Sequence, residues 1–67
     1  MKVGDLVKLD RNRCEIISEN RCFYFYPLKK NQIFLVTKEE IAFFHIIGTE
    51  GLFLISKKNI DYFGVLG

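Results

Sequence analysis

Residues 41–56, IAFFHIIGTEGLFLIS, constrain the fold more than any other part of this chain. Two apolar runs flank GTEG, a turn signal, and this pattern predicts a β-hairpin with Thr49 and Glu50 at its tip. Because side chains alternate along a strand, both faces of this hairpin are apolar. One face carries Phe44, Ile46, Phe53 and Ile55, and the other carries Phe43, His45, Ile47, Leu52, Leu54 and Ser56. A chain of 67 residues builds one core, so the second face needs a different cover.

A helix over residues 38–47 is the competing interpretation of this region. Thr37 is a possible N-cap, Glu40 its capping-box partner and Gly48 a C-cap. However, a helix that is apolar all round must be buried on every side, and 67 residues cannot surround one. We therefore favour a strand, with residues 38–40 as a turn or an exposed stretch of sheet, while the sequence leaves the helix open.

The stretch RCFYFYP, residues 21–27, predicts the second strand of another hairpin. We expect its turn at Glu19 and Asn20. This register pairs Ile17 with Cys22, Ile16 with Phe23 and Cys14 with Phe25. Phe23 and Phe25 then enter the core beside Cys14 and Ile16, whereas Tyr24 and Tyr26, whose rings carry a hydroxyl, turn outward.

Two consequences follow from this register. Cys14 and Cys22 fall on opposite faces of the hairpin, which excludes a disulfide because their side chains cannot converge. Pro27 cannot donate a hydrogen bond to a neighbouring strand, so we expect it to end the second strand.

The other segments predict three further strands. A Gly-Asp turn followed by alternation indicates a strand over residues 3–9, and an apolar run indicates one over 32–36. The polar segment 56–59 predicts a 3₁₀ turn, followed by a last strand over 60–66. Polar loops are expected at 10–13 and 27–31.

The order of these segments resembles the small SH3-like β-barrels, and in particular the short SH3-like proteins common in bacteriophage genomes. The pieces that carry the resemblance are VGDLVKL, IFLVTK, IIGTEGLFLI and SKKNIDYF, within residues 3–9, 32–37 and 46–63. The resemblance implies an all-β fold, a small SH3-like open barrel of about five strands. In it, a β-hairpin is inserted after strand one and a short 3₁₀ turn precedes the last strand. It also implies a small phage or viral accessory protein.

Length and composition indicate one domain over residues 1–67. Ten Lys and Arg residues against eight Asp and Glu give a net charge of +2, which is too small to indicate nucleic acid by itself. We find neither a run long enough to span a membrane nor the apolar block of a signal peptide. We therefore expect a cytoplasmic protein, in the host cytoplasm if it is viral.

Residue types that carry chemistry are sparse in this sequence. Two cysteines and a single histidine, His45, argue against a structural zinc site. His45 lies inside an apolar run, and on a strand Glu39 and Glu40 point in opposite directions, so they cannot act as a pair. We therefore expect a non-enzyme that uses no metal and no cofactor.

The second apolar face of the hairpin is the strongest functional lead. Three covers remain open for it: the hairpin over residues 14–26, a second copy of the chain, or a different protein. We therefore expect a non-catalytic protein-binding or assembly module, with homo-oligomerisation as one route. The candidate protein-binding residues are Tyr24, Tyr26, Phe43, His45, Ile47, Leu52 and Leu54.

A nucleic-acid-binding β-barrel is the alternative function. Such barrels combine aromatic rings that stack on bases with cationic side chains that contact the phosphates. Beyond Tyr24 and Tyr26, the candidate residues for this role are Lys29, Lys30, Lys57, Lys58 and Tyr62.

Overall fold

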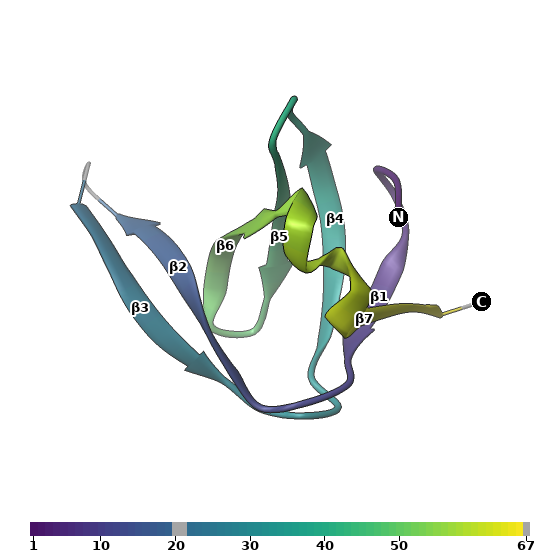
Figure 1. The fold of residues 1–67 in the computed structure, drawn as a ribbon, viewed down its shortest axis with the longest axis horizontal. Helices are drawn as coiled ribbons and strands as arrows, with labels where there is room; N and C mark the ends of the chain where they lie inside the picture. Colours follow the sequence, from purple (N-terminus) through teal and green to yellow (C-terminus); the bar gives the residue numbers. More distant parts are fainter. Residues whose placement is uncertain (20–21, 67) are drawn as a thin grey trace.

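The computed structural model describes the backbone of residues 1–19 and 22–66 and the side chains of residues 1–14 and 25–66. Within these residues the chain is all-β, with seven strands and one short 3₁₀ helix (Figure 1). The elements are β1 (Leu6–Leu9), β2 (Arg13–Glu19), β3 (Cys22–Leu28), β4 (Ile33–Glu39), β5 (Phe43–Gly48), β6 (Gly51–Ser56), η1 (Lys57–Tyr62) and β7 (Phe63–Leu66).

The strands form one antiparallel sheet in the order β3-β2-β6-β5-β4-β1-β7. The chain therefore places its first and last strands side by side, next to the meander β4-β5-β6. The hairpin β2–β3 follows β1 in sequence but lies at the other end of the sheet, beside β6 (Figure 1). Among the described residues no pairing joins β3 to β7, so the sheet is open at these two edges.

The predicted central hairpin is confirmed. Gly48 pairs with Gly51, and Phe44 and Ile46 share one face with Phe53 and Ile55 as expected. The competing prediction of a helix over residues 38–47 is wrong, because Thr37 lies inside β4 and that strand continues to Glu39. The alternation of β5 explains this outcome, since it buries every second side chain and leaves the others partly or fully exposed, which no helix would do.

The core lies on the inner face of the sheet, and we name this face after it. Its buried residues are Val7, Leu9, Leu28, Phe34, Val36, Phe44, Ile46, Phe53, Ile55 and Phe63. Three aromatic rings lie together at its centre. Phe34 packs edge-on against Phe53 with ring centroids 5.9 Å apart, and against Phe63 with centroids 6.1 Å apart. These contacts join the central meander to β7, which β1 separates from β4 in the strand order.

The predicted register of the β2–β3 hairpin is wrong by two residues. Ile16 pairs with Phe25 and Ile17 with Tyr24, so each β2 residue meets a residue further along β3 than expected. The expected turn at Glu19 and Asn20 lies partly outside the described residues. Glu19 itself belongs to β2 and pairs with Cys22.

The hairpin also turns the opposite face toward the core. Phe25 is 74% exposed and Cys14 is exposed, whereas Tyr26 packs against the core and Leu28 is buried. The cause is pairing with a distant strand, because β2 aligns Ile17 with the buried Phe53 of β6. The side chains of Phe23 and Tyr24, and that of Cys22, lie outside the described residues.

Contrary to the prediction from the sequence, Pro27 does not end its strand. It pairs with Cys14, and β3 continues to Leu28. β3 is an edge strand, where a missing N–H on the open side removes no hydrogen bond within the sheet. The predicted 3₁₀ turn is confirmed, although η1 extends further, to Tyr62, and the last strand begins only at Phe63.

The contact between Gly48 and Phe34 yields a first prediction. A Cβ at position 48 would lie 2.7 Å from two atoms of the Phe34 ring, which is buried between other rings. We expect Gly48→Ala to lower the free energy of unfolding by about 1–3 kcal/mol, as overpacking does in cores. Urea unfolding measures this change. Gly64→Ala is the matched control, since nothing lies within 4 Å of a Cβ there, and equal midpoints would contradict the prediction.

Candidate protein-binding face

The face of the sheet that points away from the core carries a continuous row of aliphatic side chains. Leu66 pairs with Leu6, Leu6 with Leu35, Leu35 with Ile47, and Ile47 with Leu52. We call these five residues the outer row. It crosses β7, β1, β4, β5 and β6, and its members are each between 38% and 49% exposed. Directly paired residues on one face have Cβ atoms about 4.5–5.5 Å apart, so the row forms one apolar strip.

Further apolar side chains widen this strip on both sides. Ile33 precedes Leu35 by two residues on β4 and Phe43 lies four residues before Ile47 on β5, and both are exposed. Leu54, partly exposed, follows Leu52 by two on β6. The outer row itself contains no charged residue. The nearest formal charge on β1 is Lys8, which pairs with Ile33 at the margin of the strip.

The structure places five of the seven predicted protein-binding residues on this outer face. Ile47 and Leu52 belong to the outer row, while His45 pairs with Leu54 and Phe43 pairs with Ser56 beside it. Tyr26 does not join them, because it turns inward and its ring lies 5.6 Å from that of Phe53. The side chain of Tyr24 lies outside the described residues.

Sequence reasoning missed the other half of the strip. Leu6, Leu35 and Leu66 lie on three strands that are distant in sequence, and Ile33 sits in a strand that reads as apolar throughout. The alternation of LVKL already marks Leu6 as sharing a face with Lys8. Only the pairing of β7, β1 and β4 brings these residues into one row with Ile47.

The β2–β3 hairpin does not cover this face. It extends the sheet at the edge of β6, where Ile16 pairs with Leu54 and Ile17 with Phe53, and Figure 1 shows it leaning away from the meander. The sequence left three covers open for the second apolar face, and the prediction that the hairpin over residues 14–26 covers it is therefore wrong. The outer row is exposed in the single chain.

Charged side chains gather at the turn between β4 and β5. His45 Nε2 lies 2.7 Å from Glu40 Oε2, and the Lys38 ammonium lies 3.8 Å from Glu40 Oε1. The hydrogen bond with His45, assisted by the Lys38 charge, lowers the pKa of Glu40 below its ordinary value of 4.5. Among the described residues, no three His, Cys, Asp or Glu side chains come close enough to hold a metal ion.

The predicted nucleic-acid-binding lysines are divided between two places. Lys57 forms an ion pair with Glu39 at 2.7 Å and lies over the Phe44 ring, next to the charged turn. Lys29 and Lys30 lie in the connection between β3 and β4, which Figure 1 shows at the far end of the molecule from the start of η1. The four lysines therefore do not form one patch.

Two arginines join the lysine pair at that far end, which the sequence did not indicate. The guanidinium carbons of Arg11 and Arg13 lie 4.4 Å and 3.9 Å from the centre of the Tyr62 ring. The Lys30 N–H donates to Asn12 Oδ1 at 2.8 Å, which ties the two loops together. Arg11 also forms an ion pair with Asp10 at 2.8 Å. The Tyr62 ring is therefore in contact with two guanidinium groups.

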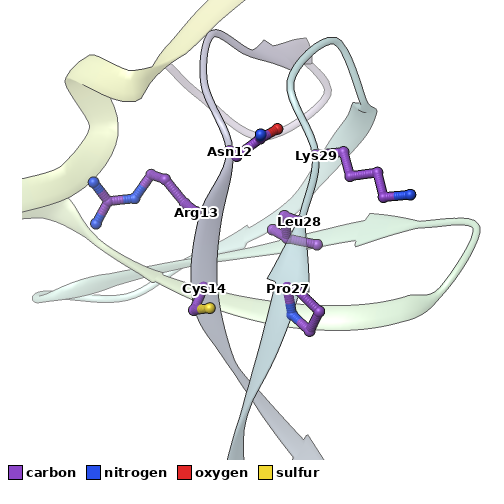
Figure 2. Close-up of a pocket in the computed structure, with 6 residues that line it drawn as sticks. All are labelled: Asn12, Arg13, Cys14, Pro27, Leu28 and Lys29. Atoms are coloured by element: carbon purple, nitrogen blue, oxygen red, sulfur yellow. The ribbon is translucent and has the colours of Figure 1, made fainter.

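An open hollow of about 410 Å³ lies beside these loops, where β2 begins and β3 ends. Figure 2 shows Cys14 and Pro27, two of its lining residues, next to each other, with Arg13 and Lys29 pointing to opposite sides. The Cys14 thiol is free and exposed. The hollow therefore offers a small apolar surface between two cationic side chains.

The orientation of the β2–β3 hairpin, with Tyr26 facing the core and Phe25 exposed, leads to a second prediction. Tyr26→Ala removes a ring that packs against Phe53, so we expect it to lower the free energy of unfolding by about 2–3 kcal/mol. Phe25→Ala, at an exposed position on the same strand, should change it by less than about 0.5 kcal/mol. Chemical denaturation of both variants measures the difference. A larger loss for Phe25→Ala would contradict the orientation of this hairpin.

The Glu40 contact predicts a pH dependence. Because the folded state lowers the pKa of Glu40, the contribution of this carboxylate is complete above pH 4.5 and is lost as the pH falls through the lowered pKa. The Tm of the wild type should therefore exceed that of Glu40→Gln at neutral pH, and the gap should close in acid. Circular dichroism across pH measures it. Asp61→Asn, which removes an exposed carboxylate outside this network, is the control, and a gap that widened in acid would contradict the assignment.

Comparisons with known proteins identify no relative of this chain. No family model, no curated protein and no solved structure matches the chain. Within the part of the chain that the structure describes, no helix is long and apolar enough to cross a membrane.

Proposed function

We propose that this protein is a non-catalytic protein-binding or assembly module that makes its contact through the outer row. The observation that carries the proposal is the unbroken line of five exposed aliphatic side chains across five strands. Contiguous apolar patches beyond a few hundred Å² commonly mark protein-binding surfaces. Each of these side chains retains contact with water that a partner would remove.

The energetic argument favours an apolar protein surface as the partner. Full burial of an aliphatic side chain contributes about 1.5–3 kcal/mol, so completing the burial of a half-exposed one contributes roughly 1 kcal/mol. Five such side chains in line would supply the apolar centre of an interface. Lys8 and the charged turn that contains Glu40 lie at the margins, where interfaces are ordinarily polar.

We further propose that the chain is a small SH3-like open barrel. The order of its elements supports this, since β1 and β7 are neighbours beside the meander β4-β5-β6, with a hairpin inserted after β1 and η1 before β7. A phage or viral origin and a cytoplasmic location are proposals that rest on the sequence resemblance. The fold carries no specific role with it, since small barrels serve many unrelated ones.

The test introduces one charge into the outer row. The immobilised chain is used to retain proteins from an extract of its source cell, and each retained protein is then purified and titrated against wild type and Leu35→Glu. We expect Leu35→Glu to weaken binding at least tenfold while leaving the fold intact, because Leu35 is exposed. Ile41→Glu is the matched control, since Ile41 is 98% exposed and lies outside the row. Equal binding by both variants would overturn the proposal.

Nucleic-acid binding remains the second candidate, favoured by Arg11 and Arg13 over the Tyr62 ring and by the bond from the Lys30 N–H to Asn12, the residue between them. The same titrations distinguish it. Binding through phosphates falls steeply as salt rises, whereas an apolar contact barely responds. A salt-sensitive complex with a single-stranded oligonucleotide, lost when Lys29 and Lys30 are both changed to Glu and kept in Leu35→Glu, would establish this function instead.

A further inference from the structure

The two edges of the sheet differ in how they are protected against pairing with another strand. β3 contains Pro27, which offers no N–H to a neighbour, and is followed by Lys29 and Lys30. β7 reads FGVL and contains neither proline nor charge. Native proteins commonly block exposed edges with such residues, so β7 is the edge that is left open to a partner strand.

The register of β1 and β7 shows which backbone groups point to the open side. The Asp10 N–H donates to the Tyr62 oxygen at 2.9 Å, and in an antiparallel pair hydrogen-bonded and non-bonded positions alternate. Gly64 and Leu66 are therefore bonded to β1, and Val65 faces away from it. The Leu9 N–H supports this alternation, since it donates to Gln32 of the next connection and thus points away from β7.

Val65 thus presents both its N–H and its C=O to the open edge. The Phe63 N–H is not available, because it donates to the Ile60 oxygen and caps η1, but the Phe63 C=O points outward as well. The Val65 side chain is 53% exposed, and no strand in the described part of the chain pairs with this side of β7. The edge offers a donor and an acceptor on one residue, which is the arrangement that two identical strands can satisfy reciprocally.

The side chains beside Val65 also fit a second copy of the same strand. If Val65 lies opposite Val65 of a second copy, then Leu66 of each chain lies opposite Gly64 of the other. Nothing lies within 4 Å of the place where a Cβ of Gly64 would be, so there is open space there for a leucine. Leu66 is itself 38% exposed, so part of its side chain is open to a neighbour.

We propose that β7 pairs antiparallel with β7 of a second copy, about a two-fold axis at Val65. Each Val65 N–H then donates to the Val65 oxygen of the other chain, and each Leu66 packs over the other chain's Gly64. The short edge makes a small interface, so the dimer is of the weak, transient kind. A different protein's strand would gain the same backbone bonds but has no built-in match for the Leu66 and Gly64 pattern.

The pairing has a consequence for the outer face. Gly64 and Leu66 lie on the same face as Leu6, and in the proposed register they lie opposite the same two residues of the second copy. The outer faces of both chains therefore lie on one side of a continuous sheet, and the two outer rows meet near Leu66. The dimer would present the proposed binding face twice, although the pairing itself does not depend on that proposal.

Sedimentation equilibrium over a concentration series tests the pairing. We expect the mass to rise from 7.9 kDa toward twice that value as the wild-type concentration increases. Val65→Pro should keep the mass at one chain, because proline removes the outward N–H while breaking no bond to β1. Val65→Lys is the second variant, should the proline prevent folding, because a lysine at an edge opposes strand pairing and leaves the internal ladder intact.

Leu35→Glu separates this proposal from association through the outer row, and it should dimerise like the wild type. A wild type that remains one chain at the highest soluble concentration would overturn the edge pairing and leave the protein-binding proposal standing. The same holds for a dimer that persists in folded Val65→Pro or Val65→Lys. A dimer lost in Leu35→Glu but kept in the Val65 variants would instead place self-association on the outer row.

Discussion

The packing of Phe34 between Phe53 and Phe63 is the contact on which the rest of this structure depends. It closes the core by joining the meander β4-β5-β6 to β7, although β7 is separated from β4 by β1 in the sheet. Gly48 is part of the same arrangement, because any side chain there would meet the Phe34 ring. A chain of 67 residues has few such contacts to draw on, and among the described side chains those buried on the inner face are apolar.

The outer row follows from the same alternation that builds the core. Once Phe34 and Val36 face inward, Leu35 must face outward, and Ile46 likewise commits Ile47 to the outer face. Alternation does not require those outward residues to be aliphatic, however, since solvent-facing positions of antiparallel sheets are commonly polar. Packing therefore explains the position of the outer row but gives no reason for its composition, which is the argument for a contact function.

The features that the sequence could predict are those decided by neighbouring residues. The hairpin at Gly48 and Gly51 has a turn signal and two adjoining apolar strands, and its register is correct throughout. The orientation of Phe25 and Tyr26 depends instead on where β2 pairs with β6, some forty residues away. We had assumed that the ring without a hydroxyl goes inward. The alignment of β2 with Phe53 of β6 outweighs that preference, and the Tyr26 ring packs against the core.

The outer row could not be predicted for the same reason, since its members belong to five strands whose order follows from long-range pairing. The unequal protection of the two edges could not be predicted either, because it also depends on long-range pairing. Pro27 suggests the end of a strand when the sequence is read alone, but in the sheet it lies within the edge strand β3, where it offers no N–H to a further strand. β7 has no such residue, and Val65, whose N–H and C=O both point to the open edge, is apolar. In the pairing that we propose, a sheet blocked at one edge and open at the other would add strands in one direction only, which would limit association to a pair of chains and oppose open-ended growth.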